Sequence, residues 1–258
     1  MFWLHEEDLP AGVGTEHFGP AHLSMIVFFL ALTLCCALYY KRLPDAGRKA
    51  AERLLGTLVF LCGLFEYGVT ALIGRFNLYT LPLHVCSLTY GFCLLHAWTN
   101  AARPGSFGAQ LHRFLGALIF HPGVLGAWAA LLFPDWLAYP FWNYLSLSGF
   151  LGHGLVSVYG ASIIVKRSEA RDPARLLRRD LFDSSLFLAV GAAVMAFFDR
   201  AAGTNYWFMA GPGVDSPLSG AYESGGFGGY LLAYLLSAAV ITALWYALRY
   251  LLSVRGRR

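Results

Sequence analysis

The chain has 258 residues, of which 57% are hydrophobic and only 13% are charged. A soluble domain carries nearly twice that charged fraction, so the composition excludes an ordinary soluble protein. The formal net charge of +4 is small and lies mostly in a few connecting loops, which argues against nucleic-acid binding. Charged residues crowd between apolar stretches of about 20 residues, the length that a helix needs to cross the hydrocarbon of a bilayer.

These apolar stretches predict an all-α fold, a bundle of about seven transmembrane helices. A single transmembrane domain over residues 21–253 would follow an external acidic tail, 1–20, and precede a basic tail, 254–258. Thr80 is the predicted N-cap of the third helix, and the Pro122–Gly123 pair predicts a kink or break in the fourth. In chain order the predicted helices cover residues 21–40, 54–74, 81–98, 111–133, 141–165, 181–198 and 230–252.

Lysine and arginine fall in alternate connections. The segments 41–53, 99–113 and 166–179 and the C-terminal tail are basic, whereas 75–79, 134–140 and 202–229 together hold one arginine. Because cytoplasmic loops collect basic residues, we expect the N-terminus outside the cell and the C-terminus in the cytoplasm, in a multi-pass protein of the cell membrane. The 202–229 connection is rich in glycine and serine, so it is either an ordered functional loop or a flexible external linker.

The five cysteines all lie inside apolar stretches: Cys35, Cys36, Cys62, Cys86 and Cys93. None belongs to a CxxC pair, so the sequence predicts neither a disulfide framework nor a cysteine zinc site. We expect no metal and no cofactor.

Ionisable side chains inside the apolar stretches are the candidates for function, since each costs roughly 2.5–3.5 kcal/mol to insert. Glu66, His84, His121 and His153 are the main ones. We predict a polar cavity toward the external side, lined by the three histidines. The alternative is that each histidine only makes a hydrogen bond that holds two helices together. For Asp199 we expect an ion pair that locks a helix end.

Depth offers one test of which thiol would meet a histidine. With a rise of about 1.5 Å per residue, Cys86 lies roughly 8 Å from its predicted helix end, whereas Cys93, His121 and His153 lie roughly 18 Å deep. This estimate pairs the histidines with Cys93, but errors of a few residues in the helix ends would erase the difference.

Several motifs together resemble the YwaF-like integral membrane proteins of bacteria, a group related to eukaryotic transmembrane protein 164. A more distant likeness is to the androgen-induced protein 1 family of membrane hydrolases, which use a threonine and a histidine. The motifs are LPLHVCSLTYGF at 81–92, FHPGVLGAW at 120–128, PDW at 134–136, GHG at 152–154 and GTNYWF at 203–208.

The resemblance implies a lipid acyltransferase or acyl-ester hydrolase of the bacterial inner membrane, with membrane lipids as acyl donor and lyso-lipid acceptor. It places the nucleophile at Cys86 and the general base at His153. Residues that would support the reaction or bind substrate are His84, His121, Glu66, Asn205 and Tyr90. Two other classes stay open: a small-solute or proton-coupled transporter that uses Glu66, His121 and His153 as relays, and a noncatalytic lipid-binding protein.

Overall fold

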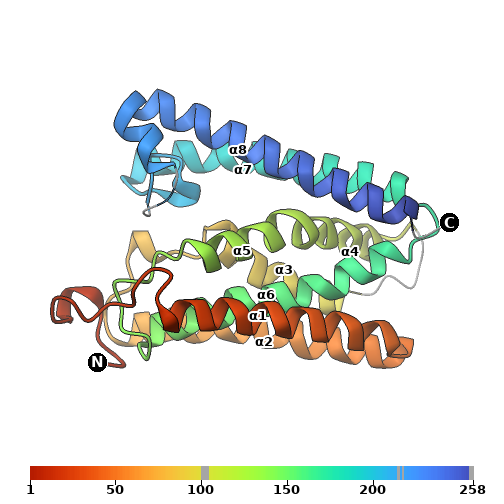
Figure 1. Ribbon diagram of the computed structural model, residues 1–258, viewed down its shortest axis with the longest axis horizontal. Helices are drawn as coiled ribbons and strands as arrows, with labels where there is room; N and C mark the ends of the chain where they lie inside the picture. The colour runs from red at the N-terminus through yellow and green to blue at the C-terminus, as the bar shows by residue number, and fades with distance from the viewer. Residues whose placement is uncertain (100–104, 214–215, 217, 256–258) are drawn as a thin grey trace.

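The computed structural model describes residues 1–99, 105–213, 216 and 218–255, and in these it is all-helical, as predicted (Figure 1). Among the described residues, six helical stretches are long and apolar enough to cross a membrane, and α3 is a shorter apolar helix. The helices are α1 Pro20–Arg42, α2 Asp45–Leu72, α3 Val85–Trp98, α4 Phe107–Leu118, α5 Val124–Leu132, α6 Tyr144–Ser168, α7 Pro173–Ala202 and α8 Ser219–Arg255.

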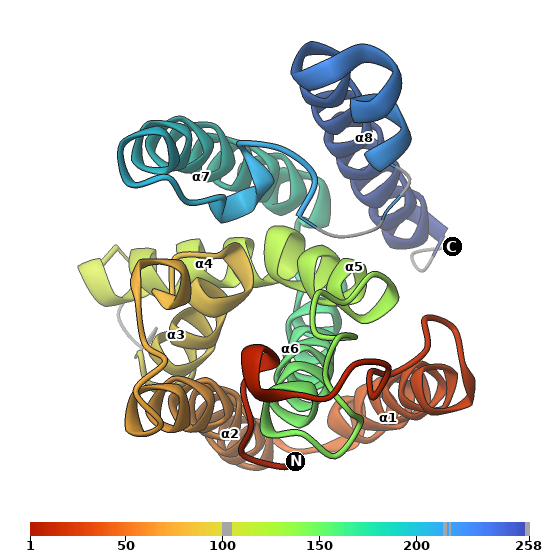
Figure 2. The ribbon, with the colours of Figure 1, turned by 90° about the vertical axis from the view of Figure 1, so that its left-hand side faces the viewer.

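Helix α6 is the centre of the bundle. Helices α1, α2 and α5 pack directly on it, and α3 and α4 complete the group (Figure 2). Helices α7 and α8 lie together on one side, next to α4 and α5 (Figure 1). Most residues of α6 are buried, including three large aromatic side chains, Tyr144, Phe150 and Tyr159.

Glycines on α6 let its neighbours approach closely. A Cβ at Gly152 would lie 2.3 Å from the hydroxyl oxygen of Tyr90, and one at Gly154 would lie 2.2 Å from the ring of Phe29. Helices in lipid have no hydrophobic driving force to associate, and the close van der Waals packing that small residues allow stabilises their contacts instead. The glycines therefore fix how far α1 and α3 stand from α6.

The fourth predicted helix is irregular at its proline, as the sequence predicted. A π-helical turn, η3 Ile119–Gly123, joins α4 to α5 and contains Pro122. A proline cannot donate a backbone hydrogen bond, and the wider turn absorbs the resulting gap in the ladder. The turn is buried throughout, next to α3, α6 and α7.

The beginning of α3 differs from the prediction. Thr80 belongs to a short 3₁₀ turn, η2 Leu78–Thr80, which Asn77 caps, and α3 begins only at Val85. The prediction of Thr80 as the cap of α3 is therefore wrong, because its hydroxyl is already bonded to the Asn77 backbone amide at 2.8 Å. His84 takes the N-cap position instead.

The described part of the long connection after α7 contains regular structure. Its first part forms a 3₁₀ turn, η4 Tyr206–Phe208, and α8 begins at Ser219, with a kink at Gly226 where φ is +58°. Asp199 makes no ion pair among the described residues. Its carboxylate accepts hydrogen bonds from the Thr204 hydroxyl at 2.7 Å and the Tyr206 amide at 2.8 Å, so the predicted salt bridge is replaced by a cap.

Ion pairs link connections that are distant in sequence at both ends of the bundle. At the end farthest from the N-terminus, Arg48 pairs with Glu169 at 2.6 Å and so joins the α1–α2 and α6–α7 connections. At the N-terminal end, Arg75 pairs with Glu7 and Asp8, which ties the acidic tail to the α2–α3 connection.

Candidate functional site

Cys86 is the second residue of α3, at the N-terminal end of the bundle, and is half-buried. Its sulfur lies 4.0 Å from the Ser87 hydroxyl, which itself lies 2.5 Å from the Tyr67 hydroxyl of α2. The late start of α3 is what puts this thiol in a first helical turn, where unpaired backbone amides and the helix dipole favour negative charge.

His153 is buried in the middle of α6, with 6% of its surface exposed. Its Nδ1 lies 2.7 Å from the Gly149 carbonyl oxygen, one turn earlier. A carbonyl only accepts, so Nδ1 carries the proton and Nε2 of the neutral ring is the acceptor. Among the described residues, this buried Nε2 has no hydrogen-bond partner.

Two aromatic side chains hold the His153 ring in place. The indole of Trp136, which follows α5, stacks on it with ring centroids 5.0 Å apart. The ring of Tyr90, on α3, lies edge-on at 6.1 Å. The site therefore draws on α3, α6 and the segment between α5 and α6.

Tyr90 sets the register of α3 against its neighbours. Its ring fits between Gly63 of α2 and Gly152 of α6, where an added Cβ would lie within 2.5 Å of it on either side. Because Gly152 precedes His153 and Cys86 lies four residues before Tyr90, the thiol is about one helical turn from the level of the imidazole.

Asp135 connects the two candidate catalytic residues electrostatically. This exposed carboxylate interacts with His84, Cys86 and His153. The sequence analysis used the PDW motif only as part of a resemblance and did not single out its aspartate. A carboxylate between a proline and a tryptophan, directly after an apolar helix, is the signal that could have identified it.

Glu66, on α2, also interacts with Cys86. Its carboxylate interacts with the Ser148 hydroxyl of α6 and electrostatically with Cys86 and Tyr90. The structure thus brings Glu66, Cys86, Tyr90 and His153 to one region of the bundle.

Cys93, which the depth estimate favoured, lies in a different environment. It has no exposed surface, and its backbone carbonyl packs against Gly56, where an added Cβ would be 2.7 Å away. Its side chain interacts with Tyr159, six residues beyond His153 on α6. The depth estimate was measured from residue 81, but α3 begins only at Val85.

His84 is held by the η4 turn. Its ring centroid lies 4.9 Å from that of Tyr206 and 5.5 Å from that of Phe208. Trp207 and Phe208 both have positive φ, near +56°, which is unfavourable for residues with a side chain. The Trp207 indole N–H donates to the Leu83 carbonyl at 2.7 Å, so this strained turn is bound to the residue before His84.

Two of the predicted supporting residues make their contacts elsewhere. The Nε2 of His121 lies 2.9 Å from the Thr242 hydroxyl of α8, and its ring packs on Tyr246. Asn205 is bonded within its own loop, where its side chain donates to the Gly211 carbonyl and accepts from the Ala210 amide. His84 and His153 both interact electrostatically with Asp135, and within the described part of the chain no such interaction is found for His121.

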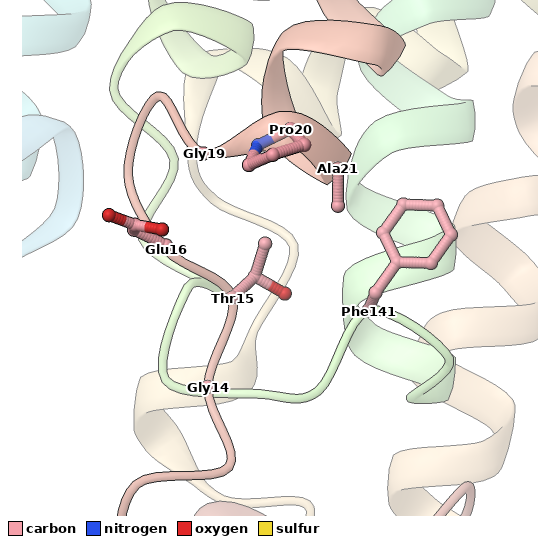
Figure 3. Close-up of a pocket in the computed structure, with 7 residues that line it drawn as sticks. All are labelled: Gly14, Thr15, Glu16, Gly19, Pro20, Ala21 and Phe141. Atoms are coloured by element: carbon pink, nitrogen blue, oxygen red, sulfur yellow. The ribbon is translucent and has the colours of Figure 1, made fainter.

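Cavities of two kinds occur near the N-terminal end. Figure 3 shows one of about 240 Å³, between the N-terminal segment and Phe141, in which the side chain of Glu16 points away from Phe141. A groove of about 380 Å³ lies between α2 and α6 and is almost entirely apolar. Among the described residues, no three His, Cys, Asp or Glu side chains are placed to hold a metal ion.

This fold and this cluster define a polytopic helical membrane protein with a polar site inside one end of the bundle. The TMEM164 family model matches residues 17–249, and the chain belongs to that family. The match confirms the resemblance to transmembrane protein 164, while the likenesses to YwaF and to androgen-induced protein 1 stay predictions. No curated protein and no solved structure shows significant similarity to the chain.

Proposed function

We propose that this protein is a membrane acyltransferase that moves a fatty acyl chain between phospholipids through a thioester on Cys86. His153 is the general base. The observation that carries the proposal is the state of His153: its Nδ1 proton is engaged by the Gly149 carbonyl, so the buried and unpartnered Nε2 is free to accept a proton.

The reaction runs in two balanced steps. The Cys86 sulfur attacks the ester carbonyl of a donor phospholipid and passes its proton to Nε2 of His153. The donor's C–O bond breaks, the leaving alkoxide of the lyso-lipid takes that proton, and the acyl group stays on sulfur. The hydroxyl of an acceptor lyso-lipid then attacks the thioester and gives its proton to Nε2, which returns it to the sulfur.

Two features of the site support this chemistry. Burial opposes ionisation of a thiol, and the first turn of α3 offsets part of that cost through its backbone amides. The negative charge of Asp135 favours the imidazolium that forms when His153 accepts the proton, although the same charge opposes a free thiolate on Cys86, so the thiol must pass its proton to His153 as it attacks.

The test uses the purified full-length protein in phosphatidylcholine vesicles with an alkyne-tagged acyl donor and a lyso-phospholipid acceptor. We expect tagged diacyl product and a hydroxylamine-sensitive tag on the protein, both lost in Cys86→Ala. Cys93→Ala removes a fully buried thiol on the same helix that interacts with Tyr159; it is the matched control and should keep both signals.

Equal labelling of wild type and Cys86→Ala would overturn the proposal and favour a carrier or a noncatalytic lipid-binding protein. Product formation with water in place of the lyso-lipid would keep the thioester and change the assignment to a hydrolase.

A further inference from the structure

The groove between α2 and α6 has a lipid-facing rim. Leu58, Leu61 and Phe65 of α2 and Leu151 of α6 are each at least 40% exposed, although they lie in the middle of membrane-length helices. The lining, here called the α2–α6 groove, consists of Phe2, Leu58, Leu61, Cys62, Phe65, Leu147, Ser148, Leu151 and Leu155. A concave apolar surface at this depth is in contact with the hydrocarbon of the bilayer.

The groove has one polar wall residue with a partner in the candidate site. Ser148 is 3% exposed; its hydroxyl donates to the Leu145 carbonyl at 3.1 Å, and its side chain lies close enough to the Glu66 carboxylate to interact with it. Glu66 in turn interacts electrostatically with Cys86 and Tyr90. Through Ser148, the wall of the groove thus borders on Glu66, which is electrostatically linked to the cluster around the thiol.

The direction of the groove matches that of a lipid in a bilayer. Phe65, Leu147 and Ser148 lie toward the N-terminal end of the bundle, whereas Leu58 and Leu155 lie about one to two helical turns deeper. The polar contact is thus at the headgroup side, and the apolar walls continue toward the bilayer centre.

We propose that the α2–α6 groove binds one acyl chain of a phospholipid from the leaflet at the N-terminal end, with the ester at Ser148 and Glu66. This deepens the proposed function, on which it rests for the fate of the chain, but the binding itself needs no chemistry. The groove is the lateral entrance by which a lipid reaches the Cys86 region without leaving the membrane.

The test is photolabelling of the Cys86→Ala protein in palmitoyl-oleoyl phosphatidylcholine vesicles that contain a phosphatidylcholine with a diazirine in its acyl chain. We expect labelling of peptides 58–65 and 147–155 to saturate at a low fraction of the probe. Labelling of the lipid-facing surface of α7 should instead rise in proportion to the probe.

Filling the groove should remove the saturable component. Leu151→Trp obstructs it from α6 and Leu61→Trp from α2, so a folding defect in one variant leaves the other. Val190→Trp, at a 55% exposed position on α7, is the matched control and should leave the labelling unchanged. Proportional labelling of the groove, or saturable labelling that survives both tryptophans, would overturn the proposal.

The two proposals fail separately. If both tryptophan variants remove the saturable labelling but the wild type shows no acyl transfer, the groove proposal is supported and the acyltransferase proposal is refuted. If the wild type transfers acyl chains but the groove is labelled only in proportion to the probe, the acyltransferase proposal is supported and the groove proposal is refuted.

Discussion

The hydrogen bond from His153 to Gly149 decides what each ring nitrogen can do. With Nδ1 bonded to a backbone carbonyl at 2.7 Å, the ring is fixed in one tautomer and Nε2 is left for chemistry. From the sequence, the glycines on both sides made His153 stand out. The tautomer could not be predicted, because it depends on how the ring is turned by Trp136, which lies in another segment.

We predict that His153→Gln lowers acyl transfer by about 10²–10⁴-fold, the usual contribution of a general base. Glutamine keeps a polar side chain of similar length but cannot accept and return a proton. Initial rates of diacyl product formation measure the loss, and thermal unfolding in detergent checks the fold. Activity within tenfold of wild type would exclude His153 as the base.

Asp135→Asn should lower the transfer rate about tenfold, equivalent to about 1.4 kcal/mol of transition-state stabilisation. The substitution removes the charge that favours the imidazolium and keeps the shape of the side chain. Glu169→Gln, which neutralises a carboxylate at the opposite end of the bundle, is the control and should have no effect on the rate. Because the same charge opposes a thiolate on Cys86, a rate equal to or above that of wild type would show that Asp135 does not assist catalysis through His153.

Among the elements, α3 shows the difference between prediction and structure that matters most for the candidate site. The lengths of the apolar stretches predicted all seven helices. The thickness of the bilayer sets that length, independently of which helices pack together. The start of α3 depends on contacts that are distant in sequence. Residues 78–84 stay outside α3, and hydrogen bonds join them to the α7–α8 connection: Tyr206 donates to the Leu78 carbonyl, Trp207 to the Leu83 carbonyl, and Tyr79 to the Gly203 carbonyl. No local pattern contains those partners, so the position of Cys86 in the first turn could not be foreseen.

The η4 turn is therefore expected to control the site from a distance. Trp207→Phe removes the hydrogen bond to Leu83 and should destabilise the protein by about 1 kcal/mol. Gly191→Leu should cost more, because a Cβ at Gly191 would already lie 2.1 Å from the Trp207 ring. Both variants should lose acyl transfer beyond their loss of stability, measured as product formation per folded molecule. Full activity in folded Gly191→Leu protein would show that the turn does not position α3.

At the scale of the whole molecule, the charged connections separate onto two ends. The Arg48–Glu169 pair gathers two basic connections at one end, and Arg75 holds the acidic tail at the other. This separation agrees with the charge pattern that predicts an external N-terminus, and the orientation itself stays a prediction.

Single reporter cysteines test that orientation in intact cells. At position 10 we expect labelling by a membrane-impermeant maleimide, and at position 46, in the first turn of α2, we expect labelling only after permeabilisation. The five native cysteines lie in apolar stretches and serve as the background in the unmodified protein. The reverse pattern would invert the topology and move the Cys86 cluster to the cytoplasmic side.

The close fit of Tyr90 between two glycines determines which mutations at these positions can be tolerated together. An alanine at Gly63 or Gly152 would clash with the Tyr90 side chain. Its destabilising effect therefore depends on which residue stands at position 90 as well as on the glycine that is replaced. A smaller side chain at position 90 would make room for it. Genetic selection for suppressors of Gly152→Ala should therefore recover second mutations at codon 90, and natural variants of the chain should change these positions together.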